Sequence, residues 1–315
     1  MELKPFPHPE NAKGVPRRVG VEIEFSGLDE GRVAALLQSK LGGHIQVVNR
    51  FIFKLADTPL GEIGIERDTA MAKKDDPTAW EKFGLEIGQT VIPVEIVSDP
   101  LSPENAEQFA DLLDFLRMHG ARGTGDGVLL AFGMHLNIEV QAMTAEAIGP
   151  TLRAYALMED WLREQMNLDL SRMALPFIRP YPRSFIDAVA DGVPEDMDDL
   201  ANLYLTHCPS RNHGLDMLPI FTTHDQDRVR EVLPEEKIGA RPTFHWRLPD
   251  CRIDDPDWSL ATAWNDWVLV EEVASRSELL NEIGHEWRKY RDDWTTIRGD
   301  FDPIITGLLK ESDLI

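Results

Sequence analysis

Acidic, imidazole and guanidinium groups recur at every second position of several short apolar segments. The clearest segment is VGVEIEF, in which Glu22 and Glu24 alternate with valine and isoleucine. A period of two places alternate side chains on opposite faces of a strand, so both carboxylates should share one face. Five segments follow this pattern, and they would present Glu22 with Glu24, Asp68, Glu95, His135 with Asn137, and His245 with Arg247.

Such a polar face has two interpretations. An isolated E-x-E pair is usually a water-exposed strand face, because antiparallel sheets often turn one polar side to solvent. Carboxylates that converge in a partly dry, concave sheet would instead repel one another, and divalent cations are the ordinary way to neutralise them. Oxygen ligands together with histidine suit Mg²⁺ or Mn²⁺. The pattern therefore predicts a metal site if the five segments meet.

The elements that would position these groups indicate an α+β fold. We expect a mainly antiparallel, curved sheet that forms a cup for metal, with helices packed on its other face. One domain would span residues 1–315, with a sheet core over about 17–250 and a C-terminal helical segment over about 256–315. Predicted strands cover residues 19–26, 45–55, 62–68, 92–96, 129–139 and 243–248, and predicted helices cover 30–41, 103–119, 151–166 and 259–291.

Two features mark the boundaries of this organisation. Ser102 can cap the helix that starts at Pro103, and Gly120 should end it. The region from about 170 to 235 is richer in proline, aspartate and asparagine than its flanks, so it is predicted to be a loop region that covers part of the molecule.

Composition narrows the class of protein. The chain has 315 residues, 43% of them apolar and 28% charged, which is typical of a folded globular protein. A formal net charge of −23 argues against nucleic acid and anionic membranes as partners. The polar, proline-containing N-terminal segment lacks the apolar stretch of a secretory signal, so a cytoplasmic location is expected. Neither Cys208 nor Cys251 lies in a zinc-binding spacing.

The segments also resemble a known family. VGVEIEF, VEIVSDPL, FGMHLNIE, SRNHGLDML and TFHWRLPD, in that order over about residues 17–250, are similar to the successive signatures of the amidoligase family. This family is a branch of the glutamine synthetase and glutamate-cysteine ligase superfamily of carboxylate-amine ligases. The resemblance implies a sheet like that of the glutamine synthetase catalytic domain, ATP and Mg²⁺ (or Mn²⁺) as cofactors, and amide formation through an acyl phosphate.

The resemblance also implies roles for individual residues. Glu22 and Glu24 would bind different metal ions, with Glu95 joining the Glu22 ion and His135 joining the Glu24 ion. The remaining expected ligands are Asp68 and His245; Arg211 and Arg247 would be catalytic and face phosphate or the substrate carboxylate, and Arg247 and Asn137 would contact the nucleotide.

The chain departs from the family pattern in its last strand. His245 stands where the family commonly has a glutamate, and Asn137 stands where many members have a second histidine. Replacing a carboxylate by an imidazole removes a negative charge, which leaves the number of bound metal ions open.

Other assignments have alternatives. In PFIRPYPRSF, Arg179 and Arg183 would form a clamp for the substrate carboxylate, or the segment is only a proline-stiffened surface loop. The expected partners are small-molecule or peptide carboxylates and amines, and the oligomeric state is open. A metal-dependent hydrolase, or a non-catalytic relative that binds nucleotide or metal, would use the same residues.

Overall fold

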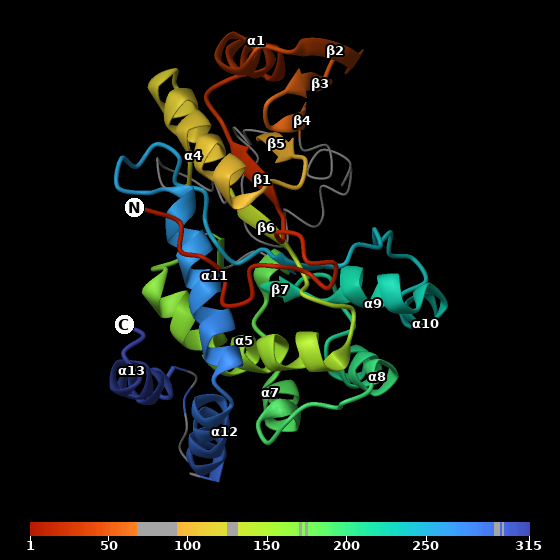
Figure 1. The fold of residues 1–315 in the computed structure, drawn as a ribbon, viewed down its shortest axis with the longest axis vertical. Coiled ribbons are helices and arrows are strands. Elements are labelled where there is room, and N and C mark those ends of the chain that lie inside the picture. The colour runs from red at the N-terminus through yellow and green to blue at the C-terminus, as the bar shows by residue number, and fades with distance from the viewer. Residues whose placement is uncertain (68–92, 125–131, 170–171, 174–175, 293–296, 298) are drawn as a thin grey trace, which may run out of the picture.

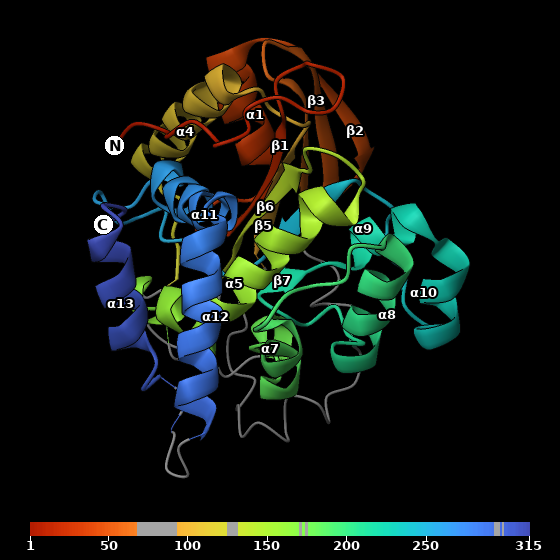
Figure 2. The same cartoon turned by 60° about the horizontal axis from the view of Figure 1, so that its bottom comes forward.

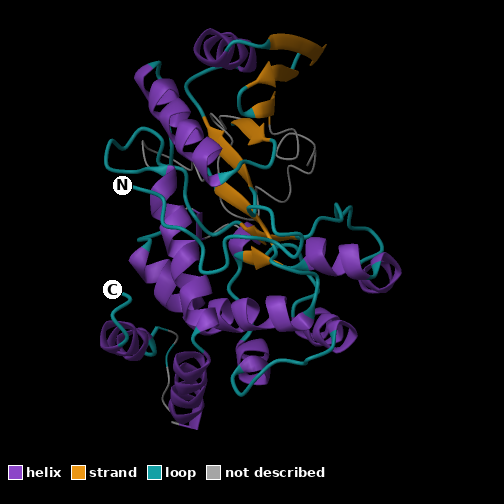
Figure 3. Cartoon of the chain, in the orientation of Figure 1, coloured by secondary structure: helices purple, strands orange, loops and turns teal. Residues whose placement is uncertain are grey.

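An eight-stranded antiparallel sheet forms the centre of the molecule, which confirms the predicted α+β class (Figures 1 and 3). This computed structural model describes residues 1–67, 93–124, 132–169, 172–173, 176–292, 297 and 299–315. The strands are β1 (Val19–Phe25), β2 (His44–Asn49), β3 (Ile52–Thr58), β4 (Gly61–Arg67), β5 (Val94–Ser98), β6 (Met134–Glu139), β7 (Leu215–Asp216) and β8 (Thr243–Trp246). Their spatial order is β2-β3-β4-β5-β1-β6-β8-β7, so the sheet is open and has two edges.

Ten α-helices surround the sheet in the described part of the chain. They are α1 (Glu30–Leu41), α4 (Pro103–Met118), α5 (Ala145–Gln165), α7 (Arg183–Val189), α8 (Met197–His207), α9 (Leu218–His224), α10 (Gln226–Val232), α11 (Leu260–Ser275), α12 (Ser277–Asp292) and α13 (Asp302–Glu311), with a short 3-10 helix, η1 (Pro176–Ile178). None of the helices within these described ranges combines the length and the apolar character needed to cross a membrane.

The period of two in the first polar segment is realised in β1. Val19, Val21 and Ile23 are fully buried in the hydrophobic core, whereas Glu22 and Glu24 are only partly buried. β1 also occupies a central place, because it pairs with β5 on one side and β6 on the other. The two glutamates therefore lie in the middle of the sheet.

Helices cover the apolar face of the sheet. α1 contacts β3 and β4 at one end. At the other end, the Trp267 ring of α11 lies 5.2 Å from the ring of Phe244 and 5.4 Å from that of Trp246, both on β8. Figures 1 and 2 both show α4 and α11 on the same side of the sheet. The polar side chains of the strands lie on the opposite face of the sheet.

Local capping explains the helix boundaries. Asp29 accepts a hydrogen bond from the Arg32 N–H at the start of α1, and the hydroxyl of Ser102 accepts one from the Asn105 N–H at the start of α4. Gly120 follows α4 with a φ of 104°, a conformation that favours glycine. The predicted extent of α1 and the predicted cap of α4 are confirmed.

Three predicted elements differ most from the structure in extent. The strand expected over 45–55 is two strands, β2 and β3, joined by a turn in which the Asn49 side chain accepts a hydrogen bond from the Phe51 N–H (2.8 Å). The helix expected over 259–291 is divided into α11 and α12 at Arg276, which leaves helical geometry. The region expected as loops over 170–235 contains α7, α8, α9 and α10.

Candidate active site

Strand register brings the predicted polar residues onto one face of the sheet. Glu22 pairs with His135 between β1 and β6, and Asn137 pairs with His245 between β6 and β8. Glu24 pairs with Glu95 between β1 and β5. Directly opposed residues of an antiparallel pair point to the same face. The polar face therefore contains Glu22, Glu24, Glu95, His135, Asn137 and His245.

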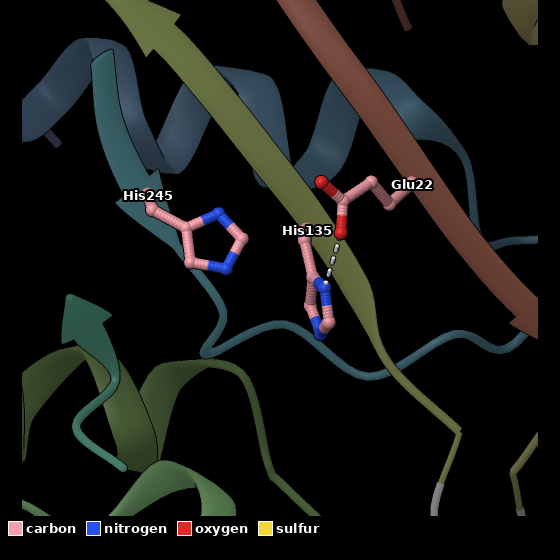
Figure 4. A group of neighbouring side chains, drawn as sticks. All are labelled: Glu22, His135 and His245. Carbon is pink, nitrogen blue, oxygen red and sulfur yellow. Dashed lines mark hydrogen bonds and ion pairs between the residues drawn. The ribbon is translucent and has the colours of Figure 1, made fainter. Parts of the chain in front are cut away.

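Glu22, His135 and His245 form one compact group, which we call the histidine cluster (Figure 4). One potential ligand atom from each residue lies within 4.8 Å of the other two. His135 Nδ1 is 3.0 Å from Glu22 Oε2. The three residues come from three adjacent strands, so the backbone of the sheet fixes their spacing.

Asn137 joins two members of this cluster. Its Nδ2 donates to Glu22 Oε1 (2.7 Å), and its Oδ1 is 2.8 Å from His245 Nδ1. Because an amide oxygen only accepts, the proton of this second contact belongs to His245 Nδ1, which leaves the Nε2 lone pair available to a cation. The predicted contact of Asn137 with nucleotide remains a prediction.

The surroundings favour the charge states that metal ligands need. Burial alone would raise the pKa of Glu22, but the hydrogen bond from His135 and the nearby imidazoles hold it well below its usual range. Burial lowers the pKa of His245 well below 6.5, so its imidazole is neutral at physiological pH. An ionised carboxylate and a neutral imidazole are the forms that bind metal.

The donor set fits a divalent cation. Two imidazoles and one carboxylate suit Mn²⁺ or another transition metal better than Mg²⁺, which prefers oxygen ligands. Asn137 supplies the outer contacts that commonly orient metal ligands. Glu22, His135 and His245 could therefore hold one ion.

A second group on the same face consists of carboxylates only. Glu24 is paired with Glu95, and Glu95 is paired on its other side with Glu66 of β4. Glu24 Oε2 also accepts a hydrogen bond from the Gly133 N–H (2.8 Å). We call Glu24, Glu66 and Glu95 the carboxylate row. Oxygen ligands of this kind suit Mg²⁺.

The carboxylate row changes two expectations. Glu66 was not among the predicted ligands, although its alternation with Ile63 and Ile65 already placed it on the polar face. The resemblance implied that Glu95 shares an ion with Glu22 and that His135 shares an ion with Glu24. In the sheet, Glu95 instead lies opposite Glu24, and His135 lies opposite Glu22. Which ion each residue binds remains a prediction, and Asp68 lies outside the described residues.

Arginines surround the end of β8, next to the polar face. Arg247 donates to the carbonyl of Arg211 (2.8 Å), and Arg211 Nε is 3.5 Å from the Asp216 carboxylate. Arg172, which is buried, donates to the carbonyl of Arg247 (2.6 Å) and forms an ion pair with Asp250 (3.1 Å). The structure thus brings Arg211 and Arg247 together, and Arg172 lies beside Arg247.

The close packing of Arg172 against β6 depends on a glycine. A Cβ placed on Gly133 would lie only 2.7 Å from the Arg172 guanidinium, so the glycine makes room for the arginine beside β6. Arg172 and Arg247 are both close enough to Glu24 to interact with it electrostatically. Positive charge is therefore concentrated beside the carboxylate row.

The predicted carboxylate clamp lies on other elements. Arg179 is exposed, and its backbone N–H donates to the carbonyl of Asn212 (2.7 Å). Arg183 is the first residue of α7. Their role in substrate binding remains a prediction.

Comparison with known proteins gives one match. A family model described as "Putative amidoligase enzyme" matches residues 15–269. No curated protein and no solved structure has significant similarity to the chain. The matched range includes the histidine cluster, the carboxylate row and the three arginines.

Proposed function

This chain belongs to the amidoligase family, and we propose that it is an ATP-dependent carboxylate-amine ligase. The single observation that carries the proposal is the register of β1 with its neighbours. It sets side by side two groups of residues that could bind metal, the histidine cluster around Glu22 and the carboxylate row around Glu24. Positions two apart on a strand are separated by roughly 7 Å, so long side chains from both can reach a common ligand.

The reaction has two steps. A carboxylate oxygen of the acid attacks the γ-phosphorus of ATP, and the bond from that phosphorus to the bridging oxygen breaks to release ADP. The amine nitrogen then attacks the carbonyl carbon of the acyl phosphate and loses a proton, and the carbon–oxygen bond to phosphate breaks. The products are an amide, ADP and inorganic phosphate.

The chain's residues would act mainly by positioning charge. Mg²⁺ or Mn²⁺, when bound, would neutralise the triphosphate and orient it. Glu22, His135 and His245 would hold one ion, and Glu24, Glu66 and Glu95 would hold another. Arg211 and Arg247 would stabilise negative charge on the transferred phosphoryl group, and Arg172 would keep the Arg247 backbone in place through its 2.6 Å hydrogen bond.

Trapping the activated acid tests this proposal. The protein is incubated with ATP, Mg²⁺ or Mn²⁺, hydroxylamine and pools of carboxylic acids, and hydroxamate and ADP are measured together. Hydroxylamine replaces the amine, so the proposal predicts equal amounts of both products from at least one pool. Samples with chelator or without ATP should give neither. Hydroxamate that forms without ATP would support the hydrolase instead, and the absence of ADP with every pool would refute the ligase.

A further inference from the structure

A cavity of about 420 Å³ opens beside the histidine cluster on the polar face. Glu22 and Asn137 line one end of it, and Gly20, Val97 and Pro100 give it an apolar surface. Its volume lies in the range of pockets that bind small molecules. The cavity thus offers a place for a ligand that reaches Glu22.

Gly20 keeps this cavity open. It is paired with Asn137 in the sheet, and a Cβ at this position would lie 3.4 Å from the Asn137 Cβ. Any larger side chain would extend over the polar face, where the cavity lies. The backbone of β1 is therefore available as an apolar floor.

Arg241 supplies the positive charge of the cavity wall. Its side chain is 42% exposed, so its guanidinium can be reached from the cavity. Its Nε has no hydrogen-bond partner within the described ranges. Arg241 Nη1 is also 3.8 Å from Glu22 Oε1, which connects this wall to the histidine cluster.

The acidic groups of the cavity, in contrast, already have donors. The two carboxylate oxygens of Glu139 accept hydrogen bonds from the Asn11 side chain (2.9 Å) and the Arg18 N–H (3.0 Å). The oxygens of Glu22 are engaged by His135 and Asn137. A ligand that completes the cavity must therefore supply acceptors, and an anionic acceptor suits an arginine best.

We propose that this cavity binds the acid substrate, and that the substrate is a small monocarboxylic acid with a short apolar body. Its carboxylate accepts hydrogen bonds from the Arg241 guanidinium, and its body lies over Gly20, Val97 and Pro100. This inference rests on the proposed ligase function, because it places the reacting carboxylate next to Glu22, where the nucleotide would be held.

Binding of simple carboxylates to the nucleotide-free protein tests the inference. The probes are butyrate, hexanoate and benzoate, measured by ligand-observed NMR, with hexan-1-ol as an uncharged control for hexanoate. We expect at least one carboxylate to bind, and hexanoate to bind at least tenfold more tightly than hexan-1-ol. A protein that binds none of the three carboxylates would overturn the inference.

Two substitutions locate the binding site. Arg241→Gln should weaken carboxylate binding by about tenfold or more, because it removes a charge-assisted hydrogen bond. Arg230→Gln, in a separate cavity beside α10, should leave it unchanged. Equal binding by the parent and Arg241→Gln, with melting curves that show both proteins folded, would also overturn the inference.

The same variants separate this inference from the ligase proposal. Arg241-dependent carboxylate binding without any ATP-dependent hydroxamate would leave the cavity as a carboxylate site and refute the ligase. Hydroxamate formation that is equally efficient in Arg241→Gln, with an unchanged KM for the acid, would retain the ligase and refute the cavity as its acid site.

Discussion

The polar face has two halves, the histidine cluster and the carboxylate row, and their carboxylates are surrounded by different kinds of groups. In the histidine cluster, Glu22 is held by His135 and Asn137, and Asn137 also binds His245, so the protein itself supplies complementary partners. In the carboxylate row, the register sets Glu24, Glu95 and Glu66 next to one another on adjacent strands. Here the nearby positive charge comes from Arg172 and Arg247, which interact electrostatically with Glu24. Like charges on adjacent strands also repel, so we expect bound cations to stabilise this half more.

The largest expected effect is a loss of activity, without loss of the fold, when Glu24 of the carboxylate row is replaced. Glu24→Gln should lower ATP-dependent hydroxamate formation by on the order of 100-fold or more, because it removes a ligand from the charge-stabilising site. The far-ultraviolet circular dichroism spectrum should stay the same. Glu107→Gln, on the exposed side of α4, is the matched control and should keep full activity. An active Glu24→Gln enzyme would contradict the assignment.

Cation binding should raise the stability of the folded protein. A cation that binds only the folded chain contributes about 2.7 kcal/mol at a hundredfold excess over its Kd, which raises the melting temperature by on the order of a few degrees. We expect Mg²⁺ to require Glu24, and Mn²⁺ to stabilise the parent more than His245→Gln. Melting curves that do not respond to millimolar Mg²⁺ or Mn²⁺, with or without an ATP analogue, would exclude a shared metal site.

Two matched substitutions compare the halves directly in metal-free protein. Glu22→Gln should lower the free energy of unfolding by about 1–3 kcal/mol, because it disrupts the contact with the buried His135. Glu24→Gln should change stability less, because the relief of repulsion within the carboxylate row and the loss of attraction to Arg172 and Arg247 act in opposite directions. Both values come from urea unfolding in the presence of chelator. A larger loss of unfolding free energy in Glu24→Gln than in Glu22→Gln would contradict this comparison.

The smallest expected effect concerns pH. Burial lowers the pKa of His245 well below 6.5, so the unfolded chain binds this proton more readily than the folded chain. His245 should therefore reduce stability as the pH falls below 6.5, and His245→Gln should have a flatter profile of melting temperature between pH 7.5 and 5.5. Burial also raises the pKa of Asp216 to about 6, so this carboxyl group increases stability as the pH falls, opposite to His245. The quantity to measure is therefore the difference between the parent and the variant. Parallel profiles would contradict the prediction.

Local patterns predicted much of the fold. Alternation in VGVEIEF gave both the strand and the face of Glu22 and Glu24, and the side chains of Asp29 and Ser102 marked helix starts through ordinary capping. The turn after Asn49 was missed because it contains neither glycine nor proline. The break at Arg276 was missed because apolar residues continue on both sides of it.

The face of the sheet on which the polar residues lie was predicted, but the pairing of these residues between strands was not. Residue type and alternation selected the face, but only the spatial order of strands decides that His135 lies opposite Glu22 and Glu95 opposite Glu24. Arg172 and Arg241 could not be selected, because neither lies in a strand whose alternation would have placed it on the polar face. Glu66 had the correct alternation and is the residue that the sequence supported and the prediction omitted.

The central place of β1 has a consequence for synthesis of the chain. Glu22 emerges from the ribosome first, but its partner His135 lies 113 residues later, and Asn137 must wait a further 108 residues for His245. Contacts between such distant residues form slowly because long loops must close first. We expect the nascent chain to lack the complete cluster until β8 has been translated, so assembly of this site should be one of the last events in folding.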